Sequence, residues 1–443
     1  MKKILIGVGT LIILAVACLP FINGMVMEKA FQHVIDQANE IYVDTEMGMN
    51  LEVIRYDRGF SSSEIEYKLN LGKLKDMLKV DSVVVIDRAK HGLTSVTSTS
   101  SLEKNPWYTQ AIENYVEGSD PLTMETEYKL LGDIISTITI DAFTLKAEGE
   151  TVDIKPGTIT AQTNREFKKF VSEGSWKGLS VGELITFSAM SFESDIELIS
   201  TFIYRGSSLV TMEGASVEEE GKRVEMKGLK VSSAVQYDDK ADRLIIDANY
   251  ALDLMKTPEG DMENLDLALH IAGVDGTAYE EAAEIYMDMM GSFFEILAQH
   301  QDDPEMMEEA MQAQMMGLGM QMVGVYEKFL KQGLELSIKK LKATLPMGNV
   351  EGAFSLILNK DVTMAQMLPM ATQPNLVFEY LSLNSDVSLP KALTGDNPML
   401  TAPLLPGMET GFFVEDGDYL KHKGITKDNK FFLNGAVVDF NAQ

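Results

Sequence analysis

Leu265-Asp266-Leu267-Ala268-Leu269 alternates large apolar residues with polar or small ones, and this period of two decides the fold. In a β-strand successive side chains point to opposite faces of the sheet, so such a segment buries one face only. Ile138-Thr139-Ile140-Asp141 and Val224-Glu225-Met226-Lys227 repeat the pattern. Many such segments follow one another without intervening helices, which predicts antiparallel sheet.

Two regions depart from this period and favour helices. Residues 28–44 follow an apolar N-terminal run and predict an amphipathic helix, which would lie next to the membrane if that run is inserted. Residues 277–332 predict an antiparallel helix pair, opened by the capping box Thr277-x-x-Glu280 and divided at Asp302-Asp303-Pro304. Each helix carries one apolar stripe and therefore needs an apolar neighbour on one side. Thr163-x-x-Glu166 predicts a further short helix.

The N-terminus predicts a membrane anchor. Lys2 and Lys3 precede an uncharged run from Ile4 to Met27, which as a helix spans a hydrocarbon core of about 30 Å. Lysines before the run keep that end in the cytoplasm. We therefore expect a single-pass protein of a bacterial inner membrane with its C-terminal body in the periplasm. Cleavage after Ala15-Val16-Ala17, or cleavage with lipidation of Cys18, are alternatives that also export the body.

The expected fold class is α+β: mostly antiparallel β-sheet with the amphipathic helix pair packed on it, preceded by the single membrane helix. The expected regions are the anchor or signal segment 1–27, the juxtamembrane helix 28–44, a β-rich region 45–276, the Met-rich helix pair 277–332 and a C-terminal β-rich region 333–443.

Charge and cysteine usage exclude several classes of function. The 67 acidic residues exceed the 38 basic ones, for a formal net charge of −29. Nucleic-acid binding requires clustered Lys and Arg, so no nucleic-acid partner is expected. Cys18 is the one cysteine and lies in the apolar run, which excludes disulfides, iron–sulfur clusters and Cys-rich zinc sites from the body.

No motif carries a recognisable reaction, so we predict no catalytic, cofactor-binding or metal-binding residue and expect no enzyme. Gly178-Leu179-Ser180-Val181-Gly182 fits the G-x-S-x-G pattern of hydrolases, but the strand, sharp turn and helix that this chemistry needs are missing around it. A glycine-flanked turn is the preferred interpretation. The histidines stand apart from any ligand-spaced partner: His33, His91, His270, His300 and His422.

Ten of the 28 methionines fall between Met287 and Met322. Thioether side chains fill irregular apolar gaps, so core packing is the preferred interpretation, with an adaptable apolar binding surface and a Cu(I) site as alternatives. The candidate apolar-ligand surface is the stripe of the second helix: Met307, Met311, Met315, Leu318 and Met322.

Three short motifs, in their order along the chain, resemble landmarks of the YdgA-like family of bacterial envelope proteins. They are Tyr56-Asp57-Arg58-Gly59-Phe60-Ser61-Ser62-Ser63, Gly273-Val274-Asp275-Gly276-Thr277-Ala278-Tyr279 and Asn429-Lys430-Phe431-Phe432-Leu433-Asn434-Gly435. Ser61 stands where the family usually has Phe. The resemblance implies a cell-envelope location and a domain with no assigned reaction. The residues that carry it are Tyr56, Arg58, Gly59, Asp275, Gly276, Asn434 and Gly435.

The function expected from these observations is a membrane-anchored, non-enzymatic binding or scaffolding module of the periplasm. Its partners would be the membrane and an unknown envelope protein or lipid. The main alternative is a protein that binds or transfers lipid or another apolar ligand, and a hydrolase is a third. A long apolar groove would favour the lipid alternative, and a closed core would favour the scaffold.

Overall fold

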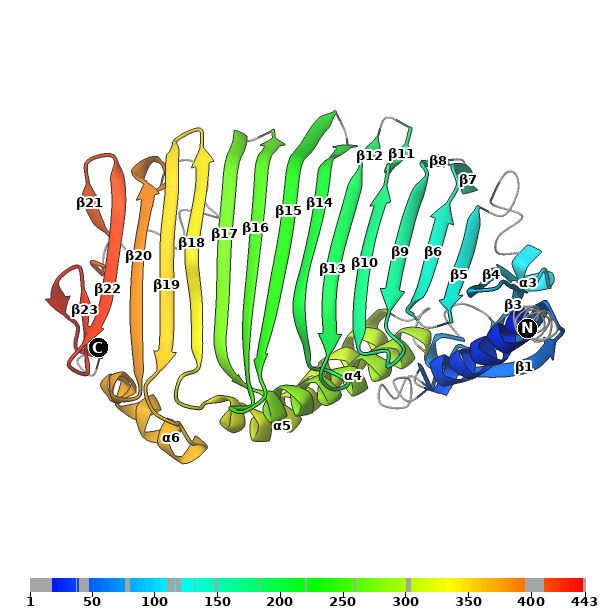
Figure 1. Cartoon of the computed structure of the whole chain (residues 1–443). Coiled ribbons are helices and arrows are strands. Elements are labelled where there is room, and N and C mark those ends of the chain that lie inside the picture. The colour runs from blue at the N-terminus through cyan, green and yellow to red at the C-terminus, as the bar shows by residue number, and fades with distance from the viewer. Residues whose placement is uncertain are drawn as a thin grey trace, which may run out of the picture. The chain divides into compact units, whose positions relative to one another are not determined.

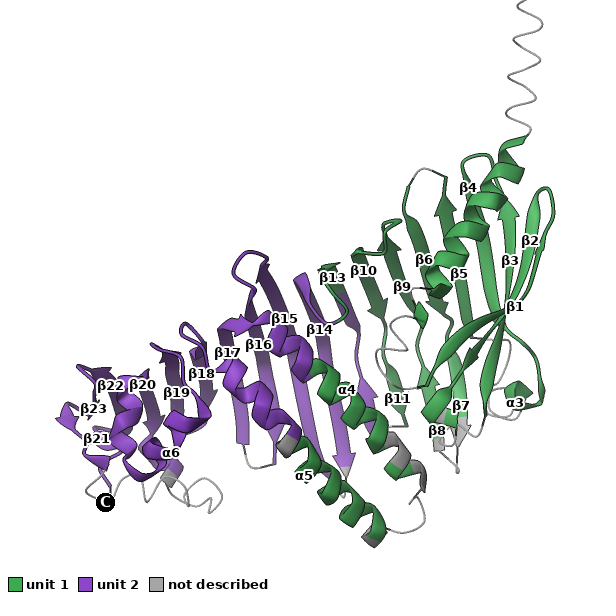
Figure 2. Ribbon diagram, turned by 90° about the horizontal axis from the view of Figure 1, so that it is seen from below, with its two compact units in different colours: residues 1–182, 193–201, 283–320 green, residues 183–192, 202–282, 321–443 purple. Residues whose placement is uncertain are grey.

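The computed structural model consists mainly of antiparallel β-strands with a few helices (Figure 1), as the alternating sequence pattern predicts. The chain divides into two compact units (Figure 2): residues 1–182, 193–201 and 283–320, and residues 183–192, 202–282 and 321–443. The residues described are 18–36, 38–39, 48–75, 80–109, 116, 121–130, 132–147, 150–182, 184–219, 221–258, 260–299, 304–394 and 410–440.

The first unit contains a sheet in which β1 to β6, then β9 and β10, pair antiparallel in that order, and β13 pairs with β10. A smaller ribbon joins β7, β8 and β11. The bounds are β1 (Asn50–Arg58), β2 (Ser62–Asn70), η1 (Gly72–Leu74), β3 (Ser82–His91), β4 (Ser95–Leu102), α3 (Pro106–Tyr108), β5 (Leu122–Lys129), β6 (Ile134–Ile140), β7 (Phe143–Ala147), β8 (Glu150–Ile154), β9 (Gly157–Thr163), β10 (Lys169–Trp176), β11 (Leu179–Val181) and β13 (Met190–Leu198).

A helix that covers residues 18–36 packs on one face of the first unit's sheet (Figure 2). Phe31 contacts the rings of Tyr56 and Tyr67 edge-on, with ring centroids 6.3 and 5.3 Å apart. Ile65, Ala89 and Val96 of the sheet are buried beneath the helix, so the helix closes the core of this unit. That core consists of Met27, Phe31, Ile35, Ile65, Ala89 and Val96.

The second unit contains an antiparallel sheet in the order β12, β14, β15, β16, β17, β18, β19, β20, β22, β23, β24, with β21 also paired to β22. Near the C-terminus β22 and β23 form an antiparallel hairpin, within the region 333–443 that the sequence predicts to be β-rich. The bounds are β12 (Ile185–Phe187), β14 (Tyr204–Glu219), β15 (Lys222–Asp238), β16 (Arg243–Thr257), β17 (Gly260–Asp275), β18 (Glu335–Leu345), β19 (Gly348–Leu358), α6 (Met364–Thr372), η3 (Pro374–Glu379), β20 (Leu381–Pro390), η4 (Lys391–Thr394), β21 (Val414–Asp416), β22 (Tyr419–Lys427), β23 (Lys430–Leu433) and β24 (Ala436–Val437).

The predicted helix pair is present as α4 (Gly276–Gln299) and α5 (Pro304–Phe329). The ammonium group of Lys328 lies 2.5 Å from the carboxylate of Glu281, which joins the end of α5 to the start of α4. The capping box at Thr163 was wrong. Residues 163–169 form a turn between β9 and β10, and Phe167 has a positive φ of 52°, outside the helical region.

The N-terminal apolar run is only partly described, since residues 1–17 lie outside the described ranges. Across the part of the chain that the structure does describe, no helix combines the length and the apolar character that crossing a membrane requires. Asn23 and Met27, which belong to that run, are 2% and 0% exposed within the first unit.

Candidate functional site

The first family-like motif holds the N-terminal helix in place. Its residues end β1, form a turn and begin β2. The guanidinium of Arg58 pairs with the carboxylate of Glu28 on the helix and lies 5.2 Å from the centroid of the Phe21 ring. Gly59 N donates a hydrogen bond to Ser62 O at 2.8 Å, which closes the turn. Tyr56 lies under the helix, where burial raises the pKa of its hydroxyl to about 12.

His91 completes this attachment from the neighbouring strand. Its Nε2 lies 2.8 Å from Ser63 Oγ, and its Nδ1 lies 3.4 Å from the carbonyl oxygen of Phe60. Burial lowers the pKa of the imidazole, which keeps the ring neutral near pH 7. Gly24 passes so close that an added Cβ would lie 2.3 Å from the ring, so only glycine fits. The adjacent Asn23 donates through Nδ2 to Gly92 O at 2.7 Å.

A second pair, Ser385 and His422, makes the same two contacts as Ser63 and His91. His422 Nε2 lies 2.6 Å from Ser385 Oγ, and Nδ1 lies 3.0 Å from the carbonyl oxygen of Phe412. A nucleophilic serine must be open to substrate and its histidine needs an orienting group. Ser63 is buried, so the first serine is closed to substrate, while Ser385 is half-buried. A backbone carbonyl oxygen lies at the Nδ1 of each buried histidine, and each ring thus has contacts within the protein at both nitrogens. We interpret both pairs as satisfied structural contacts.

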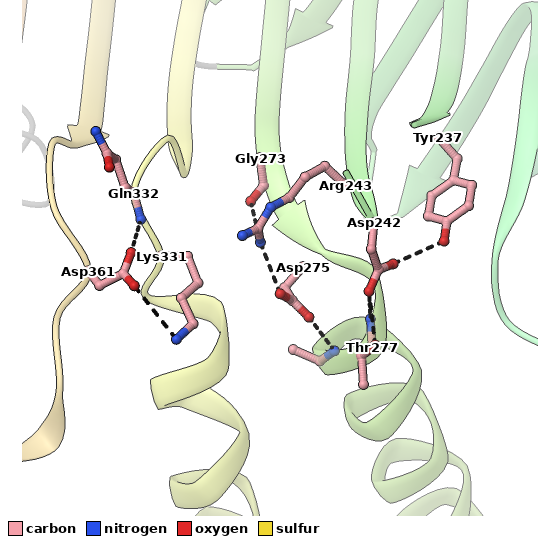
Figure 3. Close-up of polar contacts among 10 residues, drawn as sticks. Tyr237, Asp242, Arg243, Gly273, Asp275, Thr277, Lys331, Gln332 and Asp361 are labelled. Carbon is pink, nitrogen blue, oxygen red and sulfur yellow. Dashed lines mark hydrogen bonds and ion pairs between the residues drawn. The ribbon is translucent and has the colours of Figure 1, made fainter. Parts of the chain in front are cut away.

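The second family-like motif starts α4 (Figure 3). Asp275 Oδ1 accepts a hydrogen bond from Ala278 N at 3.0 Å, and its other oxygen lies 3.1 Å from a guanidinium nitrogen of Arg243. Asp275, and not Thr277, therefore caps the helix. Thr277 instead donates through both N and Oγ1 to Asp242. A Cβ on Gly276 would lie 2.0 Å from Asp242 Oδ1, so a larger residue would displace this carboxylate.

The third family-like motif forms the tight turn after β23. Asn434 and Gly435 have positive φ angles of 49° and 86°, which Asn and Gly tolerate best. Asn434 Oδ1 accepts from Lys423 N at 2.8 Å, and Nδ2 donates to Gly411 O at 3.0 Å. The motif residues thus act on three separate structural junctions, and the structure does not gather them into one site.

The predicted methionine stripe does not form a buried core. Met315 is 63% exposed, while Met307, Met311, Leu318 and Met322 are half-buried. The first four belong to the first unit and Met322 to the second. Partial exposure keeps the apolar-ligand interpretation of this stripe open as a prediction.

The two faces of the second unit's sheet differ in chemistry. Strand register places His270 opposite Asp247 and Ser337, and Ser355 opposite Asn384, so these side chains share one face. The 2.7 Å contact between His270 Nδ1 and Asp247 Oδ1 agrees with this register. The opposite face, here called the apolar face, carries Leu267, Leu269, Ile271, Ile338, Leu341, Phe354, Leu356, Leu383 and Val387.

The side chains of the apolar face are half-buried, and their neighbour Leu336 is 40% exposed. In the first unit, Ile65 and Val96 lie on a sheet face that a helix covers, and they are 0% and 1% exposed. In a folded protein, the face of a sheet on which apolar side chains gather is normally covered by other elements. The apolar face is therefore a candidate site for an apolar ligand or partner.

A hollow of about 510 Å³ lies mainly on the polar face and is also lined by Ile338, Phe354 and Ser385 of the apolar face. Two of its charged side chains pair with each other. Lys339 pairs with Glu335, and Ser337 Oγ donates to the same carboxylate at 2.6 Å. The hydrogen bonds from Lys339 and then Ser337 lower the pKa of Glu335. The lining of the hollow is mixed. Its polar residues are Glu335, Lys339, Ser355, Asn384, Ser385, Asp386 and Lys423, and its apolar residues are Ile338, Ala353, Phe354, Ile357 and Ile425.

The remaining chemical candidates stay apart from one another. Ser180 lies within β11 opposite Asp153 of β8, flanked by Gly178 and Gly182 at positive φ, and no helix follows it. Ser180 therefore lies in a short paired strand, and not in the glycine-flanked turn that the sequence favoured. Within the described ranges, no three His, Cys, Asp or Glu side chains come close enough to hold a metal ion. His300 lies outside those ranges.

The sequence comparison places the chain in a class of bacterial proteins. It belongs to the family described as bacterial protein of unknown function, DUF945, whose model matches residues 1–439. It is similar to Protein YdgA of Escherichia coli strain K12, at 21% identity over 314 residues, which are 65% of this chain and 62% of that protein. The chain therefore matches less than two thirds of that relative's length. No solved structure matches it. The resemblance to the YdgA-like family is confirmed.

Sequence reasoning missed the apolar face as a site. Each strand's alternation was visible, as in Leu265 to Leu269, but which strands lie side by side was not. It also missed the role of Asn23 and Gly24, since a polar residue and a glycine within an apolar run show no partner. One signal was available: Asn23 is the first amide side chain in that run.

Proposed function

We propose that the protein is a non-enzymatic protein of the bacterial cell envelope that binds the acyl chains of a lipid along the apolar face. The observation that carries this proposal is the contrast between the two faces of the second unit's sheet. One face bears charged and hydrogen-bonding side chains, and the other bears leucine, isoleucine, valine and phenylalanine that stay partly exposed.

The chemistry of the apolar face favours an acyl chain over a peptide. From β17 to β20, cross-strand neighbours on this face include apolar pairs such as Leu269 with Ile338 and Leu356 with Leu383. The polar side chain of Ser385 on this face already bonds His422. A peptide would bring backbone N–H and C=O groups that need partners, whereas an acyl chain brings none.

The N-terminal sequence supports the envelope part of the proposal. Phe21 and Ile22 are exposed, and burial within the first unit begins at Asn23. The uncharged residues Ile4 to Ile22 would measure about 28 Å as a helix, close to the hydrocarbon thickness of a bilayer. Lys2 and Lys3 before them would leave the body on the periplasmic side.

Site-specific photocrosslinking in living cells tests this proposal. The photoreactive residue p-benzoyl-phenylalanine is placed at Leu356 on the apolar face, or at its chain neighbour Ser355 on the polar face. After irradiation, the purified protein is analysed by mass spectrometry. We expect a lipid adduct at position 356 and none at 355. Leu269 and Ala268 form a second matched pair on β17.

Three results would count against lipid binding. Absence of lipid at both 356 and 269 removes its main support. Equal labelling by lipid at positions 355 and 356 would mean that lipid contacts both faces of the sheet without preference. A protein adduct at 356, visible as a shift to higher mass on a denaturing gel, favours the scaffold function instead. Each variant must resist protease as the wild type does, so that labelling reports a folded chain.

A further inference from the structure

The end of the first unit's sheet from which the N-terminal helix emerges carries an exposed apolar rim. Phe60 in the turn between β1 and β2 is 59% exposed, and its ring stacks on that of Phe21 with centroids 6.1 Å apart. Leu93, in the turn between β3 and β4, is 52% exposed. The hydrogen bond from Asn23 to Gly92 O places that turn beside the helix. We call Phe21, Ile22, Phe60 and Leu93 the exit rim.

Two further observations indicate what this rim contacts. The described helix begins at residue 18, close to this rim, and the residues before it in the sequence are uncharged from Ile4 onward. If that segment were inserted in a membrane, the rim would lie at the bilayer surface. Charged side chains of both signs lie at the same end of the sheet. The basic ones are Arg58, Arg88, Lys90, Lys129 and Arg165, and the acidic ones are Glu28, Asp57, Glu64, Asp133 and Glu166. This end is therefore not acidic, although the chain as a whole has a net charge of −29.

We infer that the exit rim is a second membrane contact, in which the tips of the β1–β2 and β3–β4 turns enter the interfacial region of the bilayer beside the inserted segment. Aromatic and aliphatic side chains gain free energy in that region, and neighbouring Lys and Arg reach the phosphate groups. The guanidinium of Arg58 lies over the ring of Phe21 and thus beside the exit rim. This inference rests on the proposed insertion of the N-terminal segment.

The test measures the depth of single sites in the full-length chain. Cys18 is exposed and is first replaced, Cys18→Ser, so that one new cysteine carries the label. The variants Phe60→Cys and Leu93→Cys probe the rim. Leu122→Cys is the matched control, because Leu122 is 51% exposed and lies at the opposite end of β5, about 24 Å along the strand from Lys129. Each cysteine is labelled with the environment-sensitive dye NBD.

The labelled proteins are reconstituted into liposomes of phosphatidylethanolamine and phosphatidylglycerol and floated on a density gradient. We expect all three variants to float. At positions 60 and 93, NBD emission should shift to the blue, rise several-fold in intensity and be quenched by a nitroxide on the lipid chain. At position 122, aqueous iodide should quench the dye and the lipid nitroxide should not.

The outcomes separate the inference from the proposal on which it rests. If the chain floats but iodide reaches positions 60 and 93 as readily as position 122, the rim contact is overturned and the anchor stands. If all three positions are shielded, the body lies flat on the bilayer and the rim has no special role. If the chain does not float, both the anchor and the rim contact fail.

Discussion

Asp242 combines local hydrogen bonding with a role at the start of a helix. Its carboxylate accepts from Tyr237 Oη at 3.0 Å, from Thr277 N at 3.2 Å and from Thr277 Oγ1 at 2.9 Å (Figure 3). Burial alone would raise the pKa of Asp242, but the hydrogen bonds from Thr277 and Tyr237 outweigh it and lower the pKa. A carboxyl group whose pKa is lowered in the folded state stabilises the fold at pH values above its pKa in the unfolded chain, which is about 3.9. This stabilisation is lost as the pH falls through the pKa of the folded state.

The substitution Asp242→Ala should destabilise the first turn of α4 by about 1–2 kcal/mol. The amide hydrogens of Thr277 and Ala278 should then exchange roughly 5- to 30-fold faster. Hydrogen exchange read by mass spectrometry measures this. Asp239→Ala removes the same charge from an exposed ion pair with Arg205 and should leave exchange nearly unchanged. The difference between wild type and Asp242→Ala should shrink from about pH 5 towards pH 3. A constant difference across that range would mean that the carboxylate charge plays no part.

At the scale of single elements, the N-terminal helix shows how the position of a methionine decides the effect of its substitution on stability. Met27 is 0% exposed and belongs to the core under the helix, whereas Met25 is 39% exposed. Met27→Ala should loosen the helix by about 2–5 kcal/mol through lost burial and a residual cavity. The measurement is trypsin cleavage after Lys29, which requires local opening of the helix. Met25→Ala is the matched control, and equal cleavage of the two variants would mean that the helix is not docked.

The elements also show where sequence reasoning succeeds and where it fails. Alternation predicted the strands because one sheet face is polar, as Leu265 to Leu269 show within β17. Helical spacing predicted α4 and α5. The capping box at Thr163 failed because Asn164 Oδ1 accepts from Lys168 N and Lys169 N, which stabilises a tight turn instead of a helix start. Thr277 failed as a cap because Asp242, distant in sequence, takes its hydroxyl.

The candidate site was harder to predict than the strands. Periodicity marks which side chains of one strand share a face, but it does not mark what covers that face. Leu267 and Ile65 have the same local pattern, yet a helix buries only the surroundings of Ile65. The methionine stripe was predictable from spacing. Whether Met315 packs or stays exposed depends on tertiary neighbours that the spacing does not identify.

At the scale of the whole molecule, the proposed topology makes a direct prediction. A reporter that is active only outside the cytoplasm should be active when fused after Gln443, because Lys2 and Lys3 would retain the N-terminus inside. Replacing both lysines by glutamate should reduce that activity, since the charge bias that sets orientation is then lost. Activity from a cytoplasm-only reporter at the same point would contradict an exported body.

The two-faced sheet of the second unit has a consequence for how this protein can diverge. Along β17 to β20, exchanging one branched apolar side chain for another preserves the distinction between faces. Inserting a single residue between Leu267 and Leu269 would turn Leu269 and Ile271 to the polar face and His270 to the apolar face. Descendants of this chain should therefore accumulate substitutions within strands while confining odd-numbered insertions to the turns. Their likeness would persist in the alternation long after the identity of individual residues has been lost.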